Sequence, residues 1–299
     1  MAVNTLWDSE AGVTRLATGA AWLEGPAWTP WGLLVSDIPG NRILRWNGSD
    51  SAGDFEVFAA DAEFANGRTV GPDGRVYQCS HGRRAVEELH ADGSTTVLVD
   101  HWGQARLNSP NDLVVGPDGA LWFSDPPYGI IQAHEGHLGE REYGDHYVFR
   151  FDLGTRELRP VVLDVEEPNG LAFAPDGRTL YVADTSVALQ APGLGNAHLR
   201  AYDVVPGRAC KNGRLFAQMT QGLADGFRVD IEGRLWTSHG SNVTVIAPDG
   251  EWLETIGIPE KVGNLCFGGP DGSDLYIAAS ASLYRLKTHT VEANRGWTR

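Results

Sequence analysis

Short apolar runs alternate with turn residues along the whole chain. The tripeptide Pro-Asp-Gly occurs five times, at 72–74, 117–119, 175–177, 248–250 and 270–272. Pro fixes φ at the first corner of a turn and Asp-Gly tolerates the left-handed second corner, so a copy between two strand-like runs predicts a β-hairpin. Four copies have such flanks, and two degenerate copies have the same shape around Pro30 and Ile231. The copy at 248–250 lacks them and is assigned to an outer hairpin.

Six similar hairpins predict a repeat architecture. Their turns, at residues 30, 72, 117, 175, 231 and 270, lie 39 to 58 residues apart. This period suits a four-stranded propeller blade, and the absence of long stretches with helical periodicity excludes a helical solenoid. We therefore expect an all-β fold, a six-bladed β-propeller with four antiparallel strands per blade, as a single domain over residues 1–299. Any helices should be short and peripheral, and a strand near 13–18 should close the ring against 282–287.

A polar residue stands six positions before each of these turns. The six residues are Glu24, Asn66, Asn111, Asn169, Asp225 and Asn264. Innermost strands line the central channel of a propeller, so this register predicts a ring of side-chain oxygens at one mouth. Such residues also begin strands through local turns, which is the structural alternative for each one. Two carboxylates with several amides suit Ca²⁺ or a similar cation, and Zn²⁺, Mn²⁺ or Fe²⁺ can accept the same oxygens.

The second strand of each hairpin should end beside this ring, because antiparallel strands return to the edge from which they started. Five of these strand ends carry a titratable residue: Asp37, His81, Asp125, Asp184 and His239. The two histidines are candidates to orient a polar ligand, and Asp125 and Asp184 to hold the ring amides. Solvation or a bond to a neighbouring blade is the alternative. The two longest repeats have extra residues at 126–144 and 185–198, which predicts two insertions on the same face, as lids or as disordered loops.

The composition limits the classes of ligand that the protein can bind. The 299 residues include 24 Lys and Arg against 39 Asp and Glu, a formal charge of −15. That charge argues against nucleic acid and anionic membranes as partners and allows cations and small molecules. Residues 1–10 lack a basic start followed by an apolar run, and three scattered cysteines suggest reduced thiols, so a cytoplasmic location is expected. The oligomeric state is left open.

Several segments of the chain resemble the senescence-marker-protein, gluconolactonase and luciferin-regenerating family, also called regucalcin-like proteins, and its bacterial gluconolactonase branch in particular. The matching segments are LEGPAW (23–28), ANGRTVGPDGR (65–75), LNSPNDLVV with WFSDPPYGI (107–130), EPNGLAFAPDG (167–177) and LADGFRVDIEGRLW (223–236). The resemblance implies a six-bladed propeller with one divalent metal in its channel. Its ligands would be Glu24, Asn169 and Asp225, with Asn111 as a further ligand or a substrate contact. Animal members have Arg where this chain has Ser109, so their substrate preference does not transfer.

The resemblance also implies hydrolysis of a sugar lactone, such as gluconolactone, xylonolactone or arabinonolactone, to its aldonic acid. We expect the metal to act as a Lewis acid on the lactone carbonyl, and Asp225 or a neighbouring carboxylate to take a proton from water. Asn111, His81, Asn66 and Tyr128 are the candidates for holding substrate hydroxyls. A calcium-dependent phosphotriesterase or aryl esterase is one alternative. A non-enzymatic propeller that binds calcium or carbohydrate is the other.

Overall fold

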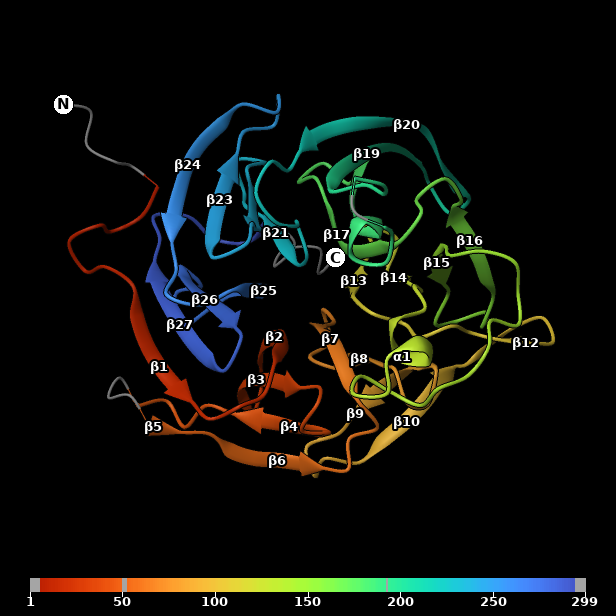
Figure 1. Cartoon of the computed structure of the whole chain (residues 1–299), viewed down its shortest axis with the longest axis horizontal. Coiled ribbons are helices and arrows are strands. Elements are labelled where there is room, and N and C mark those ends of the chain that lie inside the picture. The colour runs from red at the N-terminus through yellow and green to blue at the C-terminus, as the bar shows by residue number, and fades with distance from the viewer. Residues whose placement is uncertain (1–5, 50–52, 192, 294–299) are drawn as a thin grey trace.

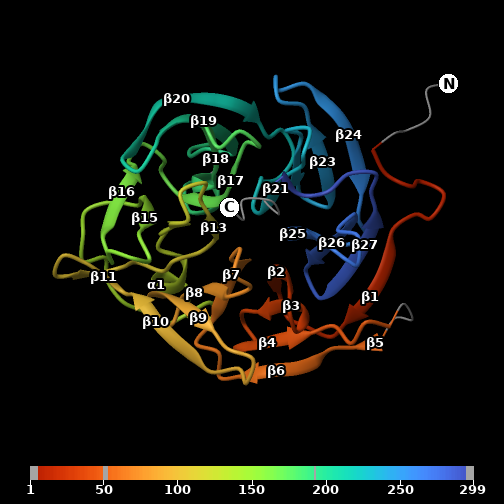
Figure 2. The ribbon, with the colours of Figure 1, turned by 180° about the vertical axis from the view of Figure 1, so that it is seen from behind.

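The computed structural model describes residues 6–49, 53–191 and 193–293. Five four-stranded antiparallel sheets and a sixth sheet that includes the first strand surround a central channel, which confirms the six-bladed propeller (Figures 1 and 2). The chain-wide extent of the domain, 1–299, stays a prediction. No helix in the described ranges is long and apolar enough to cross a membrane.

Each blade runs from the channel outward, in the order of the chain. The first blade consists of β2 (Leu23–Thr29), β3 (Gly32–Asp37), β4 (Arg42–Arg45) and β6 (Glu56–Ala60). The second consists of β7 (Ala65–Val70), β8 (Val76–Ser80), β9 (Ala85–Leu89) and β10 (Thr95–Val99). The third consists of β13 (Leu113–Val115), β14 (Leu121–Ser124), β15 (Val148–Phe151) and β16 (Leu158–Val162). A small hairpin of β11 (His101–Trp102) and β12 (Ala105–Arg106) connects the second blade to the third along the chain.

The remaining blades follow the same plan. The fourth consists of β17 (Pro168–Phe173), β18 (Thr179–Asp184), β19 (His198–Val205) and β20 (Ala209–Gln218). The fifth consists of β21 (Phe227–Val229), β22 (Leu235–Ser238), β23 (Asn242–Ile246) and β24 (Trp252–Gly257). The sixth consists of β25 (Val262–Gly268), β26 (Asp274–Ala279), β27 (Ser282–Lys287) and β1 (Thr14–Thr18), with β5 (Gly53–Asp54) added to β1. All six predicted hairpins join the first two strands of a blade, and the turn at 248–250 joins the outer strands β23 and β24.

The ring closes where the sequence predicts. β1 pairs antiparallel with β27, with Thr14 opposite Arg285 and Thr18 opposite Ser282. The first strand of the chain therefore completes the last blade, and no sheet edge is left open at that junction. Between blades, apolar side chains of adjacent sheets pack together; for example, Trp122 of β14 meets Phe173 of β17 edge to face with ring centroids 5.1 Å apart. Several of the ten tryptophans of the chain make such contacts.

The helices are short, as expected, but α1 is not peripheral. Helix α1 (Tyr128–Ile131) and the 3₁₀ helix η1 (Ser186–Ala188) belong to the two insertions. Tyr128 and Gly129 of α1 are buried, and a Cβ on Gly129 would lie 2.5 Å from Cβ of His81. The expectation of a peripheral helix is therefore wrong for α1, because the insertion folds inward over the second blade instead of extending into solvent.

Candidate metal centre and active site

All six residues of the predicted ring lie at the same end of the innermost strands. Glu24, Asn66, Asn169 and Asn264 belong to β2, β7, β17 and β25, and Asn111 and Asp225 stand two residues before β13 and β21. Five of them are buried, and Asp225 keeps a larger exposed surface. The repeat register thus corresponds to one structural level of the channel. Whether these side chains bind metal or substrate stays a prediction.

Glycines after the ring residues let neighbouring blades approach closely. The Gly67 N–H donates a 2.8 Å hydrogen bond to the Asn111 carbonyl oxygen, and the Gly170 N–H a 3.1 Å bond to that of Asp225. A Cβ on Gly67 would lie 2.5 Å from Asn111 O, closer than any side chain can come. The pairing register also shifts at Asn66 and Asn169, as in a β-bulge, which re-aims a side chain. Backbone contacts between blades therefore fix the ring.

The carboxyl groups of the ring repel one another. Burial raises the pKa of Glu24 well above its usual value, and the nearby charges of Asp225 and Asp112 raise it further. Burial also raises the pKa of Asp225 to about 7, with the Lys261 ammonium opposing the shift and Glu135 and Asp112 adding to it. These two carboxyl groups resist ionisation because of this burial and because they lie close together. A bound cation would stabilise their ionised forms.

Asp112 is a channel residue that the sequence reasoning missed. It is 1% exposed, and its Oδ2 accepts a 3.3 Å hydrogen bond from Asn264 Nδ2 and lies 3.8 Å from Arg228 Nη1. Burial raises its pKa, with the Arg228 charge opposing the shift. One sequence signal could have indicated it: Asn111 is followed by Asp, whereas Glu24, Asn66, Asn169 and Asp225 are each followed by Gly.

Asn66 is oriented by His81. The Nδ1 atom of His81 lies 3.0 Å from the Glu135 carbonyl oxygen, which can only accept, and its Nε2 lies 3.1 Å from Asn66 Nδ2. Nδ1 therefore carries the proton, and Nε2 accepts from the amide. Burial lowers the pKa of His81 to about 4, so the imidazole of His81 is neutral. The amide oxygen of Asn66 is then directed away from His81, and both nitrogens of His81 are already engaged.

The other amides of the site differ in their contacts. Asn169 Nδ2 donates a 3.3 Å hydrogen bond to Thr185 Oγ1, which lies 2.6 Å from the Tyr128 hydroxyl. Asn111 is 7% exposed, and its side-chain amide makes no hydrogen bond to any described residue. Asn111 is thus the ring amide most available to a ligand.

Most of the strand-end residues hold the backbone that leads into the ring. Asp37 accepts from the N–H groups of Ala21 and Trp22, and Asp184 from those of Glu166 and Glu167. In the third and fifth blades the corresponding bonds run from Asn108 N to Asp125 and from Gln221 N to His239. These four residues therefore hold segments two to four positions before Glu24, Asn111, Asn169 and Asp225. In the described structure Asp125 and Asp184 bond to these segments and not to the ring amides that they were expected to hold. His239 has both ring nitrogens engaged, the second by Thr244, so its predicted role in orienting a ligand gains no support.

Both insertions contact the ring side of the propeller, as predicted. The first is anchored by Ser109, whose hydroxyl donates to Pro126 O at 2.6 Å and accepts from Gly129 N at 2.9 Å. Ser109 is fully buried, and its two hydrogen bonds support the insertion. The two insertions meet where Tyr128 bonds to Thr185.

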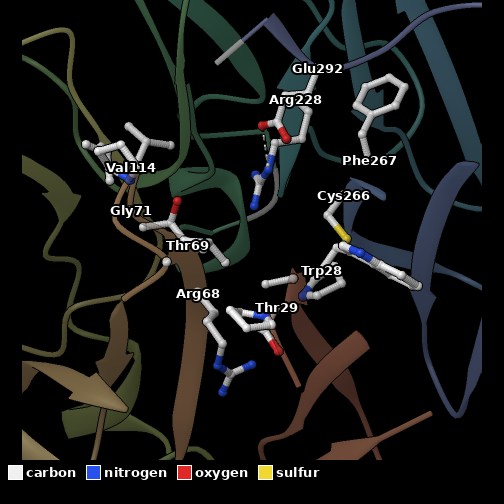
Figure 3. A pocket seen from close by; sticks show the side chains of 17 residues that line it. Trp28, Thr29, Arg68, Thr69, Gly71, Val114, Arg228, Cys266, Phe267 and Glu292 are labelled. Carbon is white, nitrogen blue, oxygen red and sulfur yellow. Dashed lines mark ion pairs between the residues drawn. The ribbon is translucent and has the colours of Figure 1, made fainter. Parts of the chain in front are cut away.

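A cavity of about 440 Å³ lies at the turn side of the channel, away from the ring. Residues that follow the ring positions line it, among them Trp28, Arg68 and Arg228 (Figure 3). The Arg228 guanidinium lies between Asp112 and Glu292, with Nε 3.6 Å from Glu292 Oε1. Arg228 thus lines the cavity and also contacts Asp112, which accepts a hydrogen bond from the ring residue Asn264.

The ring residues fit a hard divalent cation that prefers oxygen. Among the described residues, no three His, Cys, Asp or Glu side chains gather closely enough to hold a metal by themselves. A cation would need amide oxygens beside the two carboxylates, and Asn111 and Asn169 offer them. The raised pKa values of Glu24 and Asp225 and the unbonded amide of Asn111 are the observations that favour such a site.

Comparison with known proteins establishes the family. Residues 22–281 match the model of the SMP-30/gluconolactonase/LRE-like region, and the chain belongs to this family. It is 33% identical to a gluconolactonase of Zymomonas mobilis over 96% of this chain and 84% of that protein. It is 27% identical to a pentonolactonase of Haloferax volcanii over 90% and 85% of the two chains. The solved structure of a gluconolactonase from Xanthomonas campestris is 36% identical, with a TM-score of 0.83 over 92% of this chain and 89% of that one.

Proposed function

We propose that this protein hydrolyses a sugar lactone to the corresponding aldonic acid with the help of one divalent cation. Relatives over nearly the whole chain carry the names gluconolactonase and pentonolactonase. Both names denote hydrolysis of the internal carboxylic ester of an aldonolactone. The substrate class we propose is therefore a five- or six-carbon aldonolactone.

Glu24, Asn169 and Asp225 would hold the cation, with Asn111 as a fourth ligand or a substrate contact. Ca²⁺ is our first choice because the donors are carboxylate and amide oxygens, and Zn²⁺, Mn²⁺ and Fe²⁺ are the alternatives to test. A cation bound there would supply Lewis-acid stabilisation of the negative charge that develops on the lactone carbonyl oxygen.

Asp225 is the proposed general base. Asp225 is only partly buried, whereas Glu24 is 5% exposed, so water reaches Asp225 more readily. Asp112 is a poor alternative because it is 1% exposed and already engaged by Asn264 and Arg228. In our proposal Asp225 accepts a proton from the water that attacks the lactone carbonyl carbon. The ring C–O bond then breaks, and the released alkoxide oxygen takes the proton from Asp225 to give a hydroxyl and the aldonic acid.

The predicted substrate contacts divide into two groups. Asn111 and Asn66 present amide groups that substrate hydroxyls can reach, because the Asn111 amide is unbonded in the described structure and only the Asn66 N–H side is engaged. His81 would act through Asn66, since both of its ring nitrogens have partners. Tyr128 would contact the substrate through the edge of its aromatic ring, because its hydroxyl is bonded to Thr185.

The observation that carries this proposal is the pairing of Glu24 and Asp225 in one buried ring of a gluconolactonase-family propeller. The test is a panel of gluconolactone, xylonolactone and arabinonolactone with metal-stripped protein, resupplied with Ca²⁺, Mn²⁺, Zn²⁺ or Fe²⁺ in turn. We expect little turnover without metal and recovery with at least one cation. Hydrolysis of aryl esters or paraoxon instead of lactones would favour the esterase alternative. Tight metal binding with no turnover would favour a binding protein. A cytoplasmic location stays a prediction.

A further inference from the structure

Thr185 is the first residue after β18 and is 1% exposed. Its backbone N–H donates to the Glu167 carbonyl oxygen at 3.0 Å, and its Oγ1 lies 3.3 Å from the same oxygen. These two contacts fix the side chain. The hydroxyl also touches Asn169 Nδ2 at 3.3 Å and the Tyr128 hydroxyl at 2.6 Å.

The protons that each group can donate determine the direction of each hydrogen bond. A threonine hydroxyl has one proton to donate and two lone pairs to accept. Glu167 O can only accept, so it takes the Thr185 proton. Tyr128 then donates to Thr185 Oγ1, and the second lone pair accepts from the amide N–H of Asn169. All of these groups are satisfied, as their burial requires.

This arrangement determines which end of the Asn169 amide is available to the channel. The nitrogen of the amide is bound to Thr185, and the Asn169 side chain also favours the ionised form of Asp225, which lowers the pKa of that carboxyl group. The Oδ1 atom of Asn169 is left free of Thr185. A reversed amide would place Oδ1 against Thr185 Oγ1, where no proton remains to bind it.

We propose that Thr185 is a positioning residue for metal uptake: it holds Asn169 with the amide oxygen available to the cation, and it links this ligand to the first insertion through Tyr128. The inference rests on the proposed function for the identity of the metal ligands. Tyr128 belongs to α1 in the first insertion and Thr185 opens the second, so both insertions meet at one ligand. Groups that orient metal ligands typically change metal affinity about 10- to 100-fold when removed.

The test compares Thr185→Val and Thr185→Ser by isothermal titration of metal-stripped protein with CaCl₂ and MnCl₂. Valine keeps the shape and removes the hydroxyl, so we expect the Kd to rise about 10- to 100-fold, whereas serine should restore it to within about threefold. Thr288→Val is the matched control. Thr288 is 5% exposed and its hydroxyl bonds to the Ser273 carbonyl oxygen, so its loss should leave the Kd unchanged. Tyr128→Phe should weaken binding less than Thr185→Val, because Thr185 still accepts from Asn169.

A Kd in Thr185→Val equal to that of the unmodified protein would overturn the inference. If that variant does not fold by circular dichroism, Thr185→Ala provides the same comparison. Lactone turnover in the same samples separates the two proposals. Metal binding without any turnover contradicts the proposed function and leaves the Kd values to decide the role of Thr185. Turnover by a protein that binds none of Ca²⁺, Mn²⁺, Zn²⁺ and Fe²⁺ overturns the role of Thr185 and leaves lactone hydrolysis standing.

Discussion

The N–H of Gly170 donates a hydrogen bond to the carbonyl oxygen of Asp225 across the junction between the fourth and fifth blades. Gly170 directly follows Asn169, so this bond joins the backbones of two proposed metal ligands. A Cβ at position 170 would lie 2.2 Å from Asp225 O. Glycine is thus required here by close approach of two backbones.

Gly170→Ala should push the fourth and fifth blades apart at the ring. We expect a loss of about 1–3 kcal/mol in the free energy of unfolding, because the clash is with backbone that cannot rotate away. Metal affinity should fall as well, since Asn169 and Asp225 separate. Urea denaturation and calcium titration measure the two effects.

Gly257→Ala is the control for this substitution. Gly257 ends β24, a Cβ there meets nothing within 4 Å, and its φ is not left-handed. Its unfolding free energy should stay within about 0.5 kcal/mol of the unmodified protein. If alanine were tolerated equally at both positions, the tight inter-blade contact would not be a determinant of the ring.

Asp225→Asn keeps the size of the side chain and removes its charge and basicity. On the proposed function, lactone turnover should fall by about 10²–10⁴-fold, the usual contribution of a general base, and calcium affinity should also fall. Asp249→Asn, in the outer turn between β23 and β24, is the charge-matched control and should be active. Normal turnover in Asp225→Asn would remove Asp225 from the mechanism.

The metal-stripped protein should lose stability as the pH rises toward neutrality. The pKa of Asp225 is about 7 in the folded chain against an ordinary value of 3.8, and that of Glu24 is raised as well. Between these values the folded state binds more protons than the unfolded state, so the free energy of unfolding falls as the pH rises through this window.

Calcium should reverse this trend, because it binds the ionised carboxylates and displaces their protons. The increase in Tm on adding CaCl₂ should therefore be larger at about pH 8 than at about pH 5.5. Differential scanning fluorimetry at both values measures it, with Asp225→Asn as the variant that should show less pH dependence. An equal Tm increase at both values would mean that no proton competes with the cation.

The repeat made most of the fold predictable. Pro-Asp-Gly turns mark the hairpins directly, because their backbone requirements are local, and the closure of β1 on β27 follows from the need to pair the last sheet edge. The level of the ring was also predictable, since one register position recurs in each blade. The position of helix α1 was predicted wrongly because the inward fold of its insertion depends on a hydrogen bond to Ser109. Ser109 lies 20 positions before Gly129, and no sequence signal marks that contact.

Contacts between blades were not predictable. Asp112 meets Asn264 across 152 positions of sequence, and Thr185 meets Tyr128 across 57. These pairs form because the closed propeller brings strand ends together. The sequence positions of these residues do not indicate which partner each one contacts. The role of Asp112 as a buried charge near Glu24 therefore emerges only from the three-dimensional arrangement.

Ser109→Ala tests the anchoring of the first insertion. The substitution removes the 2.6 Å bond to Pro126 O and leaves the N–H of Gly129, previously bonded at 2.9 Å, without its acceptor. An unsatisfied buried group costs about 1–3 kcal/mol, and here the cost falls on the start of the insertion and on α1. We expect faster amide hydrogen exchange over residues 126–144 and a raised KM for the lactone, because His81 contacts the same segment through Glu135 O.

Ser282→Ala is the matched control, since Ser282 is equally buried but bonds to Thr18 at the ring closure. It should leave exchange over 126–144 unchanged. Unaltered exchange in Ser109→Ala would show that the apolar contacts of α1 hold the insertion without the serine. Faster exchange with an unchanged KM would separate the anchoring of the insertion from substrate binding, and would place the lactone away from α1.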